Sequence, residues 1–163
     1  MDRLWSPWRY HYVSKAEAGG PCIFCDKAAP RDDAEDFILR RGRFNYILLN
    51  LYPYTTGHVM ISPYAHLATL EELPEETLVE MMLLTRDAAR CLRDVYRPNG
   101  MNIGMNIGEC AGAGVAGHIH MHVLPRWPAD ASFITTIGET RVIPEDLPAT
   151  YRRLAEAFRD PGL

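Results

Sequence analysis

The sequence lacks any long apolar run, because no hydrophobic stretch approaches the roughly 18 residues that a membrane-spanning helix needs. The first ten residues carry three aromatic side chains and lack the apolar core of a secretory signal. There is also no excess of basic residues, since 17 Lys and Arg stand against 21 Asp and Glu and the net charge is -4. We therefore expect a cytoplasmic protein that partners neither a membrane nor a nucleic acid, with room for a few local cations that bind a small phosphorylated ligand.

Cysteine is scarce, with four in the chain, and only Cys22 and Cys25 lie close together, as Cys-Ile-Phe-Cys. In a reducing compartment this spacing indicates metal or redox chemistry before it indicates a disulfide. Residues 26–33 have the composition of a loop, which disfavours a thioredoxin-like role. Zinc needs four ligands, so a zinc site would require two histidines from elsewhere. The sequence assigns no role to Cys91 or Cys110, and the default expectation for both is small buried filler.

Length predicts a single domain over residues 1–163, and the order of the strands and helices predicted below gives it the α+β class. The content of 47% hydrophobic and 23% charged residues is typical of a soluble globular protein. Helical spacing and capping signals predict a short turn from Thr69 to Glu72, a long helix from Pro74 to Val95 and a C-terminal helix over 145–159. Apolar patterns predict strands over 36–41, 45–50, 58–63, 101–107 and 118–124. Their order predicts a mainly antiparallel sheet of about five strands.

Three of the six histidines stand at alternate positions within five residues. In an extended strand His118, His120 and His122 share one face, and the apolar residues between them share the other. A purely structural strand would keep the buried apolar area that this pattern gives up. The pattern therefore indicates a reactive face backed by a packed one.

The glycine-rich segment 112–117 directly precedes these histidines and matches the Gly-x-Gly-x-x-Gly pattern of dinucleotide-binding folds. That motif needs a helix immediately after its glycines, whereas here the histidine strand follows, so a nicotinamide site is disfavoured. We expect instead that residues 108–117 let backbone N–H groups approach an anion closely.

An imidazole between two others supports more than one chemistry. As a nucleophile it would form a covalent phosphoramidate, and its ordinary pKa keeps the attacking nitrogen neutral near pH 7. Alternatively, all three histidines would bind a catalytic zinc, or they would simply be packed or surface residues. The nucleophile is favoured, because the glycine segment would serve no purpose for a small neutral substrate.

The run from His118 to Leu124 resembles the signature of the histidine triad (HIT) family of nucleotidyl hydrolases and transferases. Asn50, the segment 57–63 and His66 resemble the earlier half of that family's domain, and Asn106-Ile-Gly with Ala111-Gly112 resembles its phosphate loop. The resemblance spans about residues 20–127, which would be the core of the domain between an N-terminal aromatic segment and a C-terminal helical extension.

Two further segments resemble the diadenosine tetraphosphate phosphorylase-like branch of the family. They are Leu4–Arg9 and the run Pro125-Arg126-Trp127 with Asp130 and Phe133. The branch implies hydrolysis or phosphorolysis of diadenosine polyphosphates or related adenine nucleotides.

The resemblance implies a role for each matching residue. His120 would attack the α-phosphorus and become nucleotidylated, and His122 would contact the scissile phosphate and help the leaving group depart. His58 would support the triad from behind, although a core histidine has the same geometry. The remaining nucleotide contacts would come from Asn50 at the ribose and from Asn106, Gly112 and Gly114 at the phosphates.

The resemblance also implies a structural zinc held by Cys22, Cys25, His66 and His118, with no catalytic cofactor. Such a metal contributes on the order of 10 kcal/mol to folding and would tie the N-terminal loop to the strand of the nucleophile. The alternative is a reduced thiol pair without metal. By analogy with the family we also expect a homodimer.

Two departures and two alternatives accompany this interpretation. Residues 112–117 lack the glutamine that many members carry before the triad, which leaves the orientation of the acceptor open. The choice between water and phosphate as the acceptor is open as well. His122 stands where the uridylyltransferase branch has glutamine, which disfavours uridylyl transfer. The alternatives are a nucleotide-binding module with incidental slow turnover and a zinc hydrolase that uses the three histidines as ligands.

Overall fold

The computed structural model describes residues 21–132, 135, 137 and 142–159. The expectations for Leu4–Arg9 and Phe133 therefore lie outside the described residues. Within the described part no helix is both long and apolar enough to cross a membrane.

A five-stranded antiparallel sheet is the centre of the fold, as the sequence predicts. Its spatial order is β1-β2-β3-β5-β4, and every neighbouring pair is antiparallel. The strands are β1 (Ile38–Arg41), β2 (Asn45–Leu49), β3 (Val59–Pro63), β4 (Gly100–Gly104) and β5 (Met121–Arg126). The helices are α2 (Ile23–Ala28), α3 (Glu75–Tyr96), the 3-10 turn η1 (Glu109–Ala111) and α5 (Leu147–Ala157).

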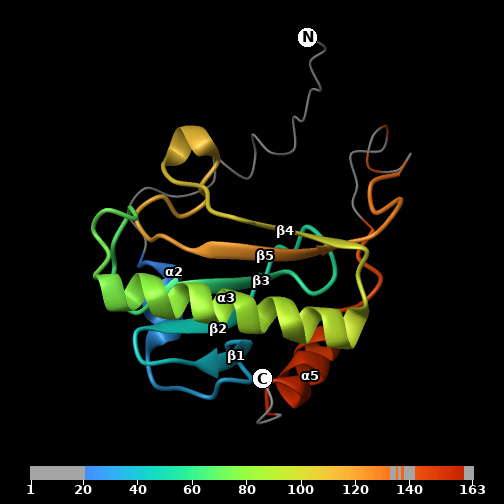
Figure 1. The fold of residues 1–163 in the computed structure, drawn as a ribbon, viewed down its shortest axis with the longest axis horizontal. Helices are drawn as coiled ribbons and strands as arrows, with labels where there is room; N and C mark the ends of the chain where they lie inside the picture. The colour runs from blue at the N-terminus through green and yellow to red at the C-terminus, as the bar shows by residue number, and fades with distance from the viewer. Residues whose placement is uncertain (1–20, 133–134, 136, 138–141, 160–163) are drawn as a thin grey trace.

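The two faces of the sheet carry different layers, because side chains alternate along each strand. Ile47 and Leu49 of β2 join the core beneath α3 and α5, whereas Tyr46 and Leu48 join a second cluster with Phe24 of α2. Figure 1 shows α3 crossing one face of the sheet with α2 behind it. A short helix and the connecting loops thus cover the face on which the site is built.

The hairpin of β1 and β2 is held to the N-terminal part of α3 by one carboxylate. Glu80 accepts hydrogen bonds from the backbone N–H groups of Arg43, Phe44 and Asn45, at 2.6 to 2.8 Å, and from the Asn45 amide at 2.9 Å. These bonds hold the pKa of Glu80 below its usual value, although partial burial opposes them. The turn between β1 and β2 is therefore held by a long-range contact.

Several predicted bounds differ from the structure, and Cys110 is exposed rather than buried as expected, whereas Cys91 is buried. The third histidine lies in β5, but the strand begins only at Met121, and β4 ends at Gly104 rather than at 107. The short turn predicted from Thr69 to Glu72 is present, and in it the Glu72 carboxylate accepts from the N–H of Thr69, as in half of a capping box. The prediction that residues 26–33 form a loop is wrong at its start, because residues 26–28 complete α2.

Candidate active site

A cleft that is open to solvent lies on the α2 side of the sheet. Among the predicted residues, those that line it are His120, His122, Asn50, Asn106, Gly112 and Gly114. The rest of its wall is mainly apolar and aromatic, from Ile23, Phe24, Leu48, Leu49, Leu51, Tyr52, Tyr54, Met60 and Val115.

The backbone fixes the tautomer of His120. Its Nδ1–H donates to the carbonyl oxygen of His118, 2.8 Å away. A neutral imidazole carries one proton, so Nε2 is left with a free lone pair. The ring is held in place by Phe24, whose centroid lies 4.6 Å from that of His120. His120 therefore has one nitrogen committed to the backbone and one available for reaction in the cleft.

A relay behind the cleft fixes the tautomer of His122. The Nδ1 atom of His58 accepts from the backbone N–H of Tyr54 and from the Asn50 amide, both at 3.2 Å. The proton of His58 is therefore on Nε2, which donates to Nδ1 of His122 at 2.9 Å. Neutral His122 then carries its own proton on Nε2, where it can be donated to a ligand.

Burial keeps both cleft histidines neutral near pH 7. Desolvation lowers the pKa of His120, although its bond to the His118 carbonyl opposes the shift. Desolvation, followed by the neighbouring His120, lowers the pKa of His122 to about 4. A neutral nucleophile beside a neutral donor is the protonation state that attack on phosphorus requires.

Only part of the glycine-rich loop can bind an anion, so the predicted anion-binding segment is shorter than expected. Gly108 and Gly112 adopt positive φ angles of 80° and 87°, which glycine adopts without strain. The N–H groups of Ala111, Gly112 and Ala113 donate to carbonyls inside the loop. Since those three amides are already used, Asn106 and the backbone near Gly114 are the parts of the loop left to contact an anion in the cleft.

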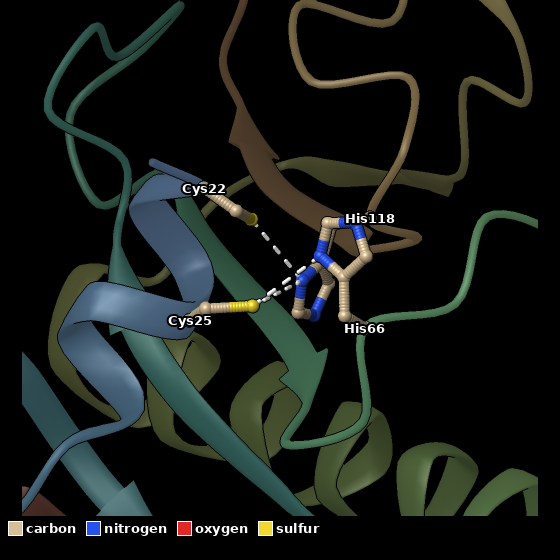
Figure 2. Close-up of side chains that lie close together, drawn as sticks. All are labelled: Cys22, Cys25, His66 and His118. Atoms are coloured by element: carbon tan, nitrogen blue, oxygen red, sulfur yellow. Dashed lines mark hydrogen bonds between the residues drawn. The ribbon is translucent and has the colours of Figure 1, made fainter. Parts of the chain in front are cut away.

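The four predicted metal ligands converge at one end of α2. Figure 2 shows Cys22 and Cys25 projecting from α2 toward the imidazoles of His66 and His118. Their four ligand atoms lie within 4.8 Å of one another, and Nδ1 of His118 is 3.3 Å from the Cys22 sulfur. Tetrahedral zinc with bonds of about 2.0–2.3 Å would place its ligand atoms about 3.3–3.8 Å apart. The donor set and its spacing therefore fit zinc.

The side chain of His118 is also oriented for metal binding. Its Nε2 lies 2.9 Å from the carbonyl oxygen of Pro63, to which it donates, so Nδ1 is free to face the sulfurs. The three triad histidines thus have separate partners: the cysteines for His118, a backbone carbonyl for His120 and His58 for His122. Within the described residues they do not converge as one ligand set, which removes the geometric basis for a three-histidine zinc hydrolase.

Sequence reasoning missed three residues of the site. Phe24 packs on His120, Tyr54 anchors His58, and Lys27 lines the cleft from α2. Tyr54 lies in a loop where only its aromatic side chain could have drawn notice. Phe24 lies between the two cysteines, so the Cys-Ile-Phe-Cys spacing was the signal that could have located it beside the site.

Fold and site together define a class of protein, an α+β domain in which alternate histidines line a cleft beside a glycine loop. The chain belongs to the HIT domain family, whose domain matches residues 32–129. The predicted resemblance to this family is thereby confirmed.

Named relatives give this class more detail. The chain is 40% identical to the AP-4-A phosphorylase of Mycobacterium tuberculosis over 169 residues, which covers 99% of this chain and 87% of that protein. It is 28% identical to the adenosine 5'-monophosphoramidase of Saccharomyces cerevisiae, covering 72% of this chain and 77% of that protein. A crystal structure of a zinc-bound histidine triad family protein from Mycobacterium smegmatis matches with a TM-score of 0.67 and 29% identity, covering 85% of this chain and 93% of that one.

Proposed function

We propose that the protein cleaves nucleotide phosphoanhydrides by nucleotidyl transfer through His120. The observation that carries the proposal is the bond from Nδ1 of His120 to the His118 carbonyl, which leaves Nε2 as the nucleophile. Similarity to a phosphorylase and a phosphoramidase, both of which act at a phosphorus centre, supports the same chemistry.

The reaction proceeds in two steps. Nε2 of His120 attacks the α-phosphorus, forming a nitrogen–phosphorus bond as the bond from phosphorus to the bridging oxygen breaks. His122 contacts the scissile phosphate, and its Nε2–H stabilises or protonates the departing oxygen, while His58 holds it in that tautomer. Water or inorganic phosphate then attacks the phosphorus and releases His120, which regains its lone pair.

The proposed substrates are diadenosine polyphosphates or related adenine nucleotides. The apolar wall of the cleft suits a nucleobase. Asn50 would contact the ribose, and Asn106 with the backbone near Gly114 would contact the phosphates, while Gly112, whose N–H is used within the loop, would line the cleft beside them. The 40% identical AP-4-A phosphorylase supports this substrate class.

Product analysis with diadenosine tetraphosphate tests this function. ADP that appears only when phosphate is present indicates a phosphorylase, and AMP with ATP in its absence indicates a hydrolase. Mass spectrometry of the quenched reaction should find adenylate on the peptide that contains His120. The variant H120N should lose turnover and adenylation while still binding AMP. Turnover that survives in H120N would reject the mechanism, and absence of turnover in the wild type would leave a nucleotide-binding module.

We further propose that Cys22, Cys25, His66 and His118 hold a structural zinc ion and that no catalytic cofactor is used. When bound, the metal supplies a fixed tetrahedral link between α2 and the segment before β5. The zinc-bound relative from Mycobacterium smegmatis supports the choice of metal. Because cysteine binds zinc as a reduced thiolate, this site also supports a cytoplasmic location.

We also propose a homodimer. Val79, Met82 and Leu83 lie on one face of α3 at helical spacing and are 46% to 57% exposed. The outer strand β4 adds the exposed Ile103, and an edge strand of this kind can pair with another chain. A second copy that covers these apolar side chains would remove them from water.

A further inference from the structure

Tyr46 of β2 lies behind the metal cluster and is completely buried. Its hydroxyl donates to the backbone oxygen of Phe24 at 2.7 Å, and Phe24 stands between the two cysteine ligands in the sequence. Burial raises the pKa of Tyr46, so near neutral pH the hydroxyl keeps its proton and remains a donor. This bond joins the sheet to the segment that carries half of the proposed metal ligands.

The bond from Tyr46 fixes more than one carbonyl group. A peptide unit is planar, so the position of the Phe24 oxygen also restricts the nitrogen and the Cα of Cys25. The backbone N–H of Asp26 donates to the Cys22 carbonyl at 2.9 Å, which closes the turn between the two cysteines. Tyr46 therefore holds the backbone from which both sulfurs project toward the histidine ligands (Figure 2).

The strands that carry Tyr46 and its neighbour also orient one histidine ligand. Tyr46 of β2 lies opposite Ser62 of β3, and the two side chains are hydrogen-bonded. The next residue, Pro63, accepts a hydrogen bond from Nε2 of His118 at 2.9 Å. Adjacent positions of one antiparallel strand pair thus position both the cysteine segment and a histidine of the cluster.

Helix α2 is too small to keep this geometry without support. It has six residues, and its N-cap, Cys22, makes no side-chain capping bond. Arg41 donates to the carbonyl oxygens of residues 27–29 and so holds the opposite end of the helix. A segment that is disordered before binding loses conformational entropy when it binds a metal, which weakens the affinity. A donor that orders the cysteine end beforehand reduces this loss.

We infer that Tyr46 is a positioning residue of the metal cluster and that its hydroxyl raises the affinity of the protein for zinc, an inference that rests on the proposed zinc site. Tyr46 acts through the Phe24 carbonyl and is not one of the four ligands. Without the hydroxyl the four ligands remain, but the cysteine segment samples other conformations. Zinc then binds more weakly and dissociates faster.

Competition for zinc with a colorimetric chelator tests the inference. Y46F keeps the aromatic ring and removes only the hydroxyl, and it should weaken zinc binding about 10- to 100-fold, as is typical for residues that orient metal ligands. The matched control is Y151F. The hydroxyl of Tyr151 also donates to a backbone oxygen, that of Ile38 at 3.2 Å, but Tyr151 lies on α5 and packs on the core of the other face of the sheet. Y151F should bind zinc as tightly as the wild type.

Melting curves with zinc and with excess chelator separate this role from general stabilisation. Since a ligand stabilises the folded state according to its affinity, Y46F should lower the Tm more in the zinc-loaded protein than in the zinc-free protein. Equal shifts in the two states, with an unchanged zinc affinity, would show an ordinary buried hydrogen bond and overturn the inference.

The same measurements distinguish this inference from the proposals on which it depends. A wild type that binds no zinc would refute the metal site and the role of Tyr46 together, whereas a zinc-binding wild type with unchanged affinity in Y46F would overturn the role of Tyr46 alone. Neither measurement uses turnover. Failure of the wild type to cleave diadenosine tetraphosphate would therefore reject the proposed reaction and leave the role of Tyr46 intact.

Discussion

The imidazole of His120 donates a hydrogen bond from Nδ1 to the backbone carbonyl oxygen of His118, 2.8 Å away. The side chain of His118 faces the cysteine sulfurs at the same time. One residue therefore belongs both to the proposed metal cluster and to the support of the proposed nucleophile.

Removal of zinc should destabilise the protein. We expect C22S to lose a stoichiometric zinc ion and to melt at least 10 °C below the wild type, because a structural zinc site contributes several kcal/mol or more to folding. Zinc content by a colorimetric chelator and melting by differential scanning fluorimetry give the two readouts. C110S changes an exposed cysteine outside the cluster and should behave as the wild type. Equal zinc content in C22S and the wild type would contradict the site.

Replacement of His58 should slow the chemical step without weakening substrate binding. H58A leaves Nδ1 of His122 without its donor, so the tautomer of His122 is no longer fixed. We expect kcat to fall about 10- to 100-fold with KM nearly unchanged, as is typical for supporting hydrogen bonds. H58Q restores an N–H donor and should recover part of the rate. A rise in KM alone would instead place His58 in substrate binding.

Acid should destabilise the fold in part through His122. Its folded pKa of about 4 lies below the unfolded value of about 6.5, so the unfolded chain binds the proton more readily as pH falls below 6.5. Between pH 7.5 and pH 5 this difference lowers the free energy of unfolding by about 2 kcal/mol. Urea titrations of the wild type and H122Q at both pH values should differ in their pH dependence by that amount. Parallel losses in the two proteins would rule out this contribution.

Gly57 should tolerate no side chain. Its φ angle is 76°, and an added Cβ would lie 3.1 Å from Leu92 and from Tyr96. G57A should lower the free energy of unfolding by about 1–3 kcal/mol and reduce kcat, because His58 is the next residue. The control is G104A in β4, where a Cβ meets nothing within 4 Å. Chemical unfolding measures the free energy of unfolding of both variants. Equal values for G57A and G104A would contradict the strain at Gly57.

Charge on the exposed face of α3 should separate the proposed dimer. M82D places a carboxylate among Val79 and Leu83, so burying that face would require desolvating a charge. Light scattering coupled to size-exclusion chromatography should report a dimer for the wild type and a monomer for M82D. R90D, in the same helix but outside the apolar group, should remain dimeric. A monomeric wild type would refute the proposal.

The sheet and its reactive face were predictable because alternation is a local signal. The alternation of histidine and apolar residues correctly predicts which side chains enter the core, namely Ile119, Met121 and Val123. This holds even though the hydrogen-bonded pairing with β3 begins only at Met121. Helix α3 was equally predictable, because its apolar residues recur over many turns and Pro98 follows its end.

What the sequence could not provide are contacts between distant segments. Helix α2 has six residues, too few for helical periodicity, and its N-cap is Cys22 rather than a usual capping residue. In the sequence, Glu80 looks like an ordinary solvent-exposed charge on a helix. Only the folded structure shows that its carboxylate binds the turn before β2. Lys27 became part of the site only because Asp36 holds its ammonium group beside the cleft.

The small size of α2 makes one wall of the cleft dependent on contacts from elsewhere in the chain. An isolated helix of six residues is unstable in water, and this one is held by the Tyr46 hydroxyl, which donates to the Phe24 carbonyl at 2.7 Å, and by the cysteine–histidine cluster. The wall that carries Phe24 and Lys27 therefore owes its stability to β2 and to that cluster, so a change at either place should alter the cleft without touching a residue that lines it.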